Sequence, residues 1–383
     1  MARDSLEFRF PLQRLLAALI LILVPVTVFG FYIALQADKH VHQMSGAYLR
    51  TITRTSAVTT SEFIAQRITD VGLIANETGV VEAITAANRA SERLTDSAIR
   101  LHADQVESKW NSPEADPLVT TILTSDLAAL LRRHRELNPM LLKITVADRM
   151  GATVAATDKP LHYFQTDSDY WRALFSRSAD AVYISELHAD GRGGVAYVSI
   201  VYPVLQAGSG RFIGAVAALV TLSPLFVHLN QQQVARTGRL FLVRDDGTVI
   251  NAPGITASMR VKSGEYAAIR DALGTLQGRE AGYLDATLPN GLAYLIGFAD
   301  TGLKQAYPNL GWIVIASQEE REAAGPVRNT AQFALVVMIL GLLMLTVLGA
   351  YVFLHRTLYL ADLEMPQKEE KRTEAPDSGN RPE

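Results

Sequence analysis

The chain has 383 residues, of which 49% are hydrophobic, and its mean hydropathy of +0.13 is higher than a soluble protein needs. A formal net charge of −3 leaves no basic footprint for nucleic acid, so we expect no nucleic-acid partner. Because there is no cysteine, disulfides, thiolate zinc sites, iron–sulfur clusters and cysteine nucleophiles are excluded as well.

The excess of hydrophobic residues is concentrated in two runs without a charged residue, 15–35 and 333–354. At about 1.5 Å of rise per helical residue each run spans roughly 32 Å, and a bilayer core is about 30 Å thick. A cleaved signal peptide is the alternative for the first run, but the run is longer than a typical signal core and no clean small-x-small cleavage site follows it. We therefore predict one transmembrane helix over residues 15–35 and another within residues 329–354.

Basic residues lie on the outer flank of both runs. They are Arg3, Arg9 and Arg14 before the first run, and Arg356, Lys368, Lys371 and Arg372 after the second. Because Lys and Arg accumulate on the cytoplasmic side of a membrane, residues 1–14 and the tail 355–383 are predicted to be cytoplasmic. The tail is rich in proline and charge without apolar periodicity, so we expect it to be disordered.

A long helical pattern opens the stretch 36–142 that follows the first run. Apolar residues recur there at steps of three and four, at Val41, Met44, Tyr48 and Ile52, and the stripe resumes at Phe63, Ile64, Ile68 and Val71. This spacing predicts a stalk helix that continues the first run outward. Serine and threonine interrupt a strict heptad, so two interpretations stay open: a homodimer along this helix, or a helix packed along its own domain.

Further helices and a hairpin follow. The patterns over 80–107 and 117–136 predict two helices, separated by a proline break at 111–113. Residues 143–158 then change to a period of two around an Asp and Gly bend, which predicts a strand, turn and strand. The segment 169–176 predicts a short helix with an acidic first turn, and three strands follow it.

The same order of elements then returns. The hairpin pattern of residues 144–156 recurs over 240–253, an offset of about 97 residues, and a helix and three strands again follow it. We therefore predict two tandem mixed α/β modules of one topology, over residues 143–223 and 224–328.

Four short motifs of the first module carry a resemblance. They are D-Y-W-R-A-L at 169–174, Y-I-S at 183–185, Y-P-V at 202–204 and the strand at 210–222. In this order and spacing they resemble the membrane-distal half of a double Cache domain, and the resemblance covers about residues 38–322. It implies an α+β fold in which a long N-terminal stalk helix carries two tandem PAS-like antiparallel-sheet Cache modules, here between two transmembrane helices. Such domains commonly serve as extracytoplasmic small-molecule sensors in bacteria, which implies a periplasmic ectodomain on an inner membrane.

A cluster of aromatic residues in the first module predicts a ligand pocket. Tyrosine and tryptophan give a pocket apolar walls and hydrogen-bonding rims, and packing of the same rings in the core is the alternative. The predicted ligand-binding residues are Asp169, Tyr170, Trp171, Tyr183, Ser185, Tyr197, Ser199 and Tyr202. The second module is expected to be structural, since it has few equivalents of these aromatics.

The resemblance also bears on the ligand. Cache receptors for amino acids carry an arginine and two acids at positions that here hold Ser168, Ser185 and Leu219. Without them a carboxylate and an α-ammonium lose their partners, so the small-molecule ligand is predicted not to be a free α-amino acid. Asp169 suits a cationic group, whereas Arg172 or Lys159 suits an acid, so the polarity of the ligand stays open.

Nothing in the sequence indicates catalysis, a cofactor or a metal. No H-E-x-x-H, G-x-S-x-G, S-x-x-K or P-loop pattern occurs, and His40 and His42 are spaced so that they do not share a helical face. Asp148 and the pair Asp245-Asp246 lie at matched hairpin turns, which favours turn chemistry over metal binding. Trp312 is expected to fill the core of the second module. We therefore predict that the protein is not an enzyme.

The resulting hypothesis is a periplasmic sensor or co-receptor held in the inner membrane. The 29 residues after the second run are too few for an output domain. The signal is therefore expected to pass through a separate partner, a kinase, cyclase or chemoreceptor. The alternative is a scaffold that uses the same ectodomain for protein contacts in a cell-envelope complex.

Overall fold

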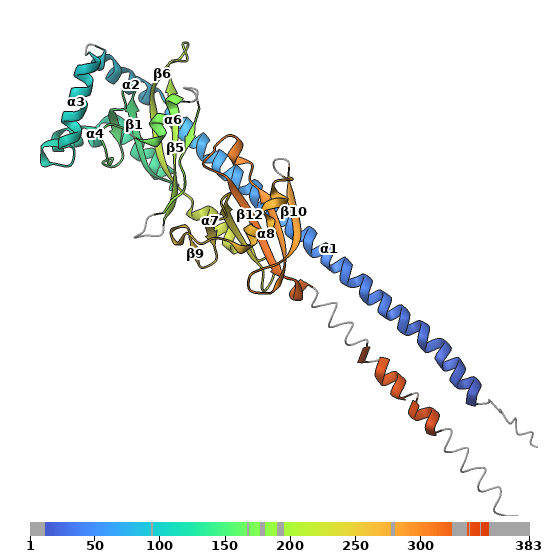
Figure 1. Cartoon of the computed structure of the whole chain (residues 1–383). Coiled ribbons are helices and arrows are strands. Elements are labelled where there is room, and N and C mark those ends of the chain that lie inside the picture. The colour runs from blue at the N-terminus through green and yellow to red at the C-terminus, as the bar shows by residue number, and fades with distance from the viewer. Residues whose placement is uncertain are drawn as a thin grey trace, which may run out of the picture. The chain divides into compact units, whose positions relative to one another are not determined.

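The computed structural model describes residues 12–92, 95–166, 168–176, 181–189, 195–276, 280–323, 335–336, 338–344 and 346–351 (Figure 1). The chain divides into a central unit, Met44–Glu322, and a terminal unit formed by Met1–Gln43 with Ala323–Glu383. The predicted cytoplasmic tail 355–383 lies outside the described residues, as do residues 1–11 of the predicted cytoplasmic N-terminus.

The first helix, α1 (Leu12–Ala75), begins in the terminal unit and runs for 64 residues. The described parts of residues 335–351 are helical as well. Among the described residues, no helix combines the length and the hydropathy that a membrane crossing needs. The two predicted spans therefore stay predictions.

Within the central unit, α1 buries a stripe that agrees with the predicted one in its second half, where Ile64 and Val71 are buried, and differs from it in the first half. The buried positions step by three or four and include Leu49, Thr53, Ser56, Thr60 and Ile64. Met44 and Tyr48, which the predicted stripe contained, are 72% and 48% exposed. The hydropathy pattern missed the first half of the stripe because Thr53, Ser56 and Thr60 are polar. Thr53 Oγ1 donates to the carbonyl of Leu49 at 2.9 Å within the helix, whereas Ser56 Oγ donates to Gln232 Oε1 at 3.0 Å.

Four helices and a 3₁₀ turn separate α1 from the first sheet. They are α2 (Thr78–Ser91), α3 (Asp96–Lys109), η1 (Pro113–Ala115), α4 (Asp116–Thr124) and α5 (Asp126–Leu137). The two predicted helices are thus each divided in two. At both divisions a hydroxyl caps the next helix: Thr95 accepts from Ala98 N, and Ser125 accepts from Ala128 N. A side chain that satisfies a free N–H at a helix start favours a new helix over continuation.

The first sheet is antiparallel and has the order β2-β1-β6-β5-β3, with β4 also paired to β5. Its strands are β1 (Leu141–Asp148), β2 (Thr153–Ala156), β3 (Tyr183–Ile184), β4 (His188–Ala189), β5 (Ala196–Leu205) and β6 (Phe212–Thr221). The short helix α6 (Asp169–Ser176) comes between β2 and β3 in the chain, as the sequence predicts.

The second sheet repeats this topology, with the order β10-β11-β12-β7-β8-β9. Its strands are β7 (Arg239–Arg244), β8 (Val249–Ala252), β9 (Ile255–Thr256), β10 (Ala281–Thr287), β11 (Ala293–Asp300) and β12 (Trp312–Glu319). The helical elements around it are α7 (Ser223–Gln231), η2 (Ala257–Met259), α8 (Gly264–Leu273) and η3 (Leu303–Gln305). The α+β class with two antiparallel sheets is therefore confirmed. We call β1–β6 with α2–α6 the first module and β7–β12 with α7 and α8 the second.

Each sheet packs one face against α1 and the other against a short helix. Successive residues of a strand point to opposite faces, so alternate residues enter different clusters. In β12, Trp312 and Val314 join the large cluster that contains α1, whereas Ile313 and Ile315 join the cluster under α8. The first sheet behaves in the same way, with Trp171 of α6 on the face away from α1.

We predict that Gly297→Ala destabilises the protein, because α1 crosses β11 at this residue. A Cβ atom at Gly297 would lie 2.7 Å from the backbone oxygen of Leu49, so helix and strand must separate. Overpacking of this kind costs about 1–3 kcal/mol of the free energy of unfolding. Denaturant unfolding of the full chain in detergent, followed by tryptophan fluorescence, measures the loss.

Gly274→Ala is the matched control for this substitution. An added Cβ there lies 3.4 Å from its nearest neighbour and the backbone is right-handed helical, so the stability should change by less than about 1 kcal/mol. Equal stability of both variants would contradict the close packing of α1 on β11.

Candidate functional site

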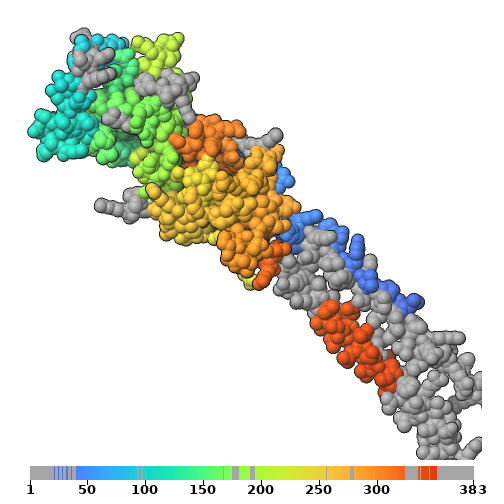
Figure 2. Space-filling view, viewed as in Figure 1, coloured from blue at the N-terminus to red at the C-terminus, as the bar shows by residue number. Residues whose placement is uncertain are grey.

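A cavity of about 770 Å³ lies on the α6 side of the first sheet. Its walls come from α6, β3, β4, β5 and β6, together with the loop Tyr307–Asn309 of the second module. The surfaces of the two modules meet in the space-filling view, green against yellow and orange (Figure 2). Both modules therefore contribute residues to the cavity, which lies within the central unit.

Strand parity places the cavity-facing side chains. Tyr197 and Ser199 lie two residues apart on β5 and face the same side of the sheet. Tyr183 of β3 lies opposite Val201 in the ladder, and the N–H of Ser185 donates to the carbonyl of Ser199 at 2.9 Å. Neighbouring strands thus bring two tyrosines and two serines onto one surface.

Six of the eight predicted ligand-binding residues line this cavity. They are Asp169, Tyr170, Tyr183, Ser185, Tyr197 and Ser199. Trp171 does not: it is 4% exposed, and its ring packs against Phe212 at 5.9 Å beneath α6. Since Trp171 follows Tyr170 directly on a helix, it points about 100° away, toward the sheet.

Tyr202 also lies outside the cavity, on the opposite face of the sheet. It is an odd number of residues from Ser199, so its side chain points toward α1. A Cβ atom at Gly72 of α1 would lie 2.8 Å from the Tyr202 ring, which shows how closely ring and helix pack. Tyr202 therefore belongs to the core between sheet and helix.

Several cavity residues were not predicted: Glu186, His188, Tyr307, Pro308 and Asn309. His188 stacks on Tyr197 with ring centroids 5.6 Å apart. Asn309 donates from Nδ2 to the carbonyl of Ile184 at 2.8 Å, which fixes the loop of the second module to β3. The loop is more than one hundred residues from α6 in the sequence, and no local pattern marks it.

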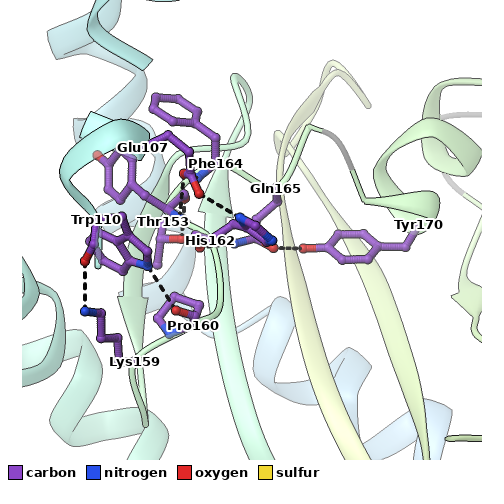
Figure 3. Close-up of polar contacts among 10 residues, drawn as sticks. Glu107, Trp110, Thr153, Lys159, Pro160, His162, Phe164, Gln165 and Tyr170 are labelled. Carbon is purple, nitrogen blue, oxygen red and sulfur yellow. Dashed lines mark hydrogen bonds and ion pairs between the residues drawn. The ribbon is translucent and has the colours of Figure 1, made fainter. Parts of the chain in front are cut away.

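A network of hydrogen bonds fixes the hydroxyl end of Tyr170 (Figure 3). Its hydroxyl donates to Gln165 Oε1 at 2.6 Å, and Gln165 Nε2 donates to the carbonyl of His162 at 2.8 Å. Glu107 of α3 lies 2.7 Å from His162 Nδ1 and accepts from the backbone N–H of Phe164 at 3.2 Å. The loop that positions Tyr170 is thereby tied to the helical region of the first module.

Burial raises the pKa of Tyr170 well above that of a free tyrosine, and a hydrogen bond from Ser168 opposes this only weakly. The phenol is therefore neutral at physiological pH. A neutral phenol whose proton already goes to Gln165 offers a ligand its oxygen lone pairs and its ring face.

The two cations that the sequence left open for an acidic ligand both have partners within the protein. Lys159 Nζ donates to the carbonyl of Trp110 at 2.8 Å and lies 5.2 Å from the centre of that ring (Figure 3). Arg172 pairs with Asp169 at 2.7 Å on an exposed surface. Neither cation lines the cavity, whereas the carboxylates Asp169 and Glu186 do.

The aspartates at the hairpin turns have the structural role that their positions indicate. Asp148 Oδ1 accepts from the N–H groups of Met150 and Ala152 at 2.9 and 3.0 Å. Asp246 Oδ1 accepts from Thr248 N at 2.8 Å in the matching turn. Both carboxylates close their own turns.

Comparison with known families decides what kind of domain this is. The model of the double Cache family, described as Cache domain (dCache_1), matches residues 38–327. The chain belongs to the double Cache family. The resemblance predicted from the motifs is therefore confirmed, and Cache domains are ligand-binding sensor domains rather than catalytic ones.

Solved structures of Cache domains are similar to this chain at low identity. One is the ligand-binding domain of the amino acid chemoreceptor PctC of Pseudomonas aeruginosa with GABA, with 17% identity, a TM-score of 0.44, and coverage of 71% of this chain and 98% of that one. Another is that of the chemoreceptor Tlp3 of Campylobacter jejuni with 4-methylisoleucine, with 9% identity, a TM-score of 0.47, and coverage of 74% and 94%. That of CtaA of Pseudomonas fluorescens with L-isoleucine has 15% identity, a TM-score of 0.46, and coverage of 75% and 97%. No curated protein matches the chain.

We predict that Gln165→Leu destabilises this Cache domain through Tyr170. The substitution leaves a half-buried hydroxyl without its acceptor, which costs about 1 kcal/mol. Adding Tyr170→Phe removes the orphaned hydroxyl, so the double variant should recover most of the loss. A double-mutant cycle from denaturant unfolding of the full chain measures the coupling. Strict additivity of the two substitutions would contradict the hydrogen bond.

Proposed function

We propose that this protein is a periplasmic small-molecule sensor or co-receptor of a bacterial inner membrane, and that its ligand binds in the cavity of the first module. The observation that carries the proposal is a cavity of about 770 Å³ whose lining combines tyrosine rings with a few polar groups. Small-molecule sites in proteins have this size and this mixture. Membership of the double Cache family supports the sensory role.

The proposed binding residues are the six predicted ones that line the cavity, and their hydrogen bonds suggest different roles. Among the described residues, the Tyr197 hydroxyl and the Ser199 hydroxyl have no hydrogen-bond partner, so both can bind a ligand. Ser185 Oγ already donates to the carbonyl of Glu186 at 2.7 Å and accepts from Ser199 N at 2.9 Å. Ser185 therefore positions the backbone of the cavity wall at Glu186 and Ser199.

The loop Tyr307–Asn309 offers a route for the signal. It lines the cavity and leads directly into β12, which ends at Glu319 near the end of the central unit. Tyr307 also packs on the cluster that contains α1. A ligand that binds one arrangement of this loop more tightly than another shifts the population toward that arrangement.

The membrane arrangement is part of the proposal. The uncharged runs 15–35 and 333–354 would span the bilayer, and the basic residues on their outer flanks would keep both termini in the cytoplasm. A partner kinase, cyclase or chemoreceptor would then read the ligand state through the spans or the tail. Pairing of two copies along α1 remains compatible with the exposed face that includes Met44 and Leu73.

Thermal-shift screening of the full chain in detergent against a library of small metabolites tests the sensory role. A ligand at one hundred times its dissociation constant stabilises the fold by about 2.7 kcal/mol. Tyr197→Ala should abolish the shift, whereas Tyr294→Ala, which changes a partly buried tyrosine of the second sheet, should leave it in place. A fold that no metabolite stabilises but that retains a protein partner in pull-downs would favour the scaffold.

Single cysteines test the predicted orientation, and the chain offers a background without cysteine. Ser209→Cys, in the exposed turn between β5 and β6, should react with a membrane-impermeant maleimide in cells whose outer membrane is permeable. Ser378→Cys in the tail should react only after lysis. The reverse pattern of labelling would place the Cache domain in the cytosol and end the periplasmic proposal.

A further inference from the structure

Tyrosine rings dominate the wall of the cavity. Tyr170 and Tyr183 have ring centroids 6.5 Å apart at an angle of 43°, and Tyr197 and Tyr307 line the same space. The face of an aromatic ring carries negative potential and attracts cations within about 6 Å of its centre. Four such rings around one cavity favour a positively charged guest.

The charges on the described part of the lining have one sign. Asp169 and Glu186 are carboxylates. The lining also contains the base His188, but no lysine or arginine occurs among the described lining residues. The partners of the two carboxylates, Arg172 and Arg244, lie outside the lining. Among the described lining residues an acidic ligand would therefore meet two carboxylates, while the arginines paired with them lie outside the lining.

Both carboxylates can exchange their arginine for a ligand at little cost. The side chains of Asp169 and Arg172 are 86% and 69% exposed, and that of Glu186 is 61% exposed. An ion pair as exposed as Asp169–Arg172 contributes at most about 1 kcal/mol, and in the Glu186 pair it is Arg244, 29% exposed, that is the more buried partner. Asp169 also lies in the first turn of α6, where its charge offsets the positive end of the helix.

We propose that the cavity binds an organic cation, with its ammonium group among the tyrosine rings and near Glu186 or Asp169. This inference rests on the proposed sensory function and assigns the chemical class of the ligand. The volume of about 770 Å³ also accommodates an apolar or polyamine body attached to the charged group.

Isothermal titration calorimetry on the full chain in detergent tests the class with probes of similar shape and different charge. The probes are choline, its neutral isostere 3,3-dimethylbutan-1-ol, the anion 3,3-dimethylbutanoate, and the polyamine spermidine. Choline or spermidine should bind at least about tenfold more tightly than the neutral alcohol, since ring faces and carboxylates both favour the charge. The anion should bind more weakly than the alcohol.

Variants connect the binding to the residues named. Glu186→Gln should weaken the cation about three- to tenfold and leave the alcohol unchanged, whereas Glu114→Gln, at an equally exposed paired carboxylate outside the cavity, should change neither. Tyr197→Leu should lower the affinity for the cation at least about fivefold and by more than Tyr197→Phe does, because the ring supplies the attraction for the charge and the hydroxyl only an added hydrogen bond. Arg244→Gln frees Glu186 from its competitor, so it should strengthen cation binding.

The outcomes separate this inference from the proposed function. If a neutral or anionic probe binds as tightly as both cations and its binding depends on Tyr197, the assignment of a cationic ligand is wrong. The proposed sensory function is left intact by that result. Cation binding that survives both Glu186→Gln and Tyr197→Leu overturns the assignment to this cavity. If no probe and no library metabolite binds, the sensory function and the inference fail together.

Discussion

The packing of α1 against the backs of both sheets is the constraint on which the rest of the structure depends. The helix comes so close that glycine is needed at the contacts, at Gly297 of β11 and at Gly72 beneath Tyr202. Leu49, Ile64 and Val71 of α1 share one hydrophobic cluster with strands of both sheets. Because one face of each sheet is committed to this helix, only the other face is left for a site.

The two modules use that remaining face differently, although their strands are connected in the same order. In the second module α8 covers the face, and Phe241, Ile269 and Phe298 fill the space beneath it. In the first module α6 has eight residues, and small side chains such as Ala215 and Ala217 lie on the facing strand. Beside α6, the side chains of Tyr197, Ser199 and Leu219 on the same sheet line the cavity.

Much of this arrangement could be predicted because it is written in local patterns. Hairpins, the short helix and the repeat follow from periodicity and turn residues, and six cavity residues follow from aromatics on neighbouring elements. Strand parity alone would have placed Tyr202 on the opposite face from Ser199. The first half of the buried stripe of α1 was missed because Thr53, Ser56 and Thr60 occupy it and their hydroxyls have hydrogen-bond acceptors. Tyr307 and Asn309 could not be predicted, since only the packing of one module on the other brings them to the cavity.

The β5 strand has consequences for how receptors of this kind diverge. One set of β5 residues packs in the core next to α1, and the alternate set faces the cavity. Most substitutions along β5 therefore change either the packing of the core or the lining of the cavity. The edge strands β3 and β4, with two residues each, and the loop from the second module carry far less of the core. Related proteins that bind a different class of ligand are therefore expected to differ mainly in these edge strands and in this loop, and less along the long central strands.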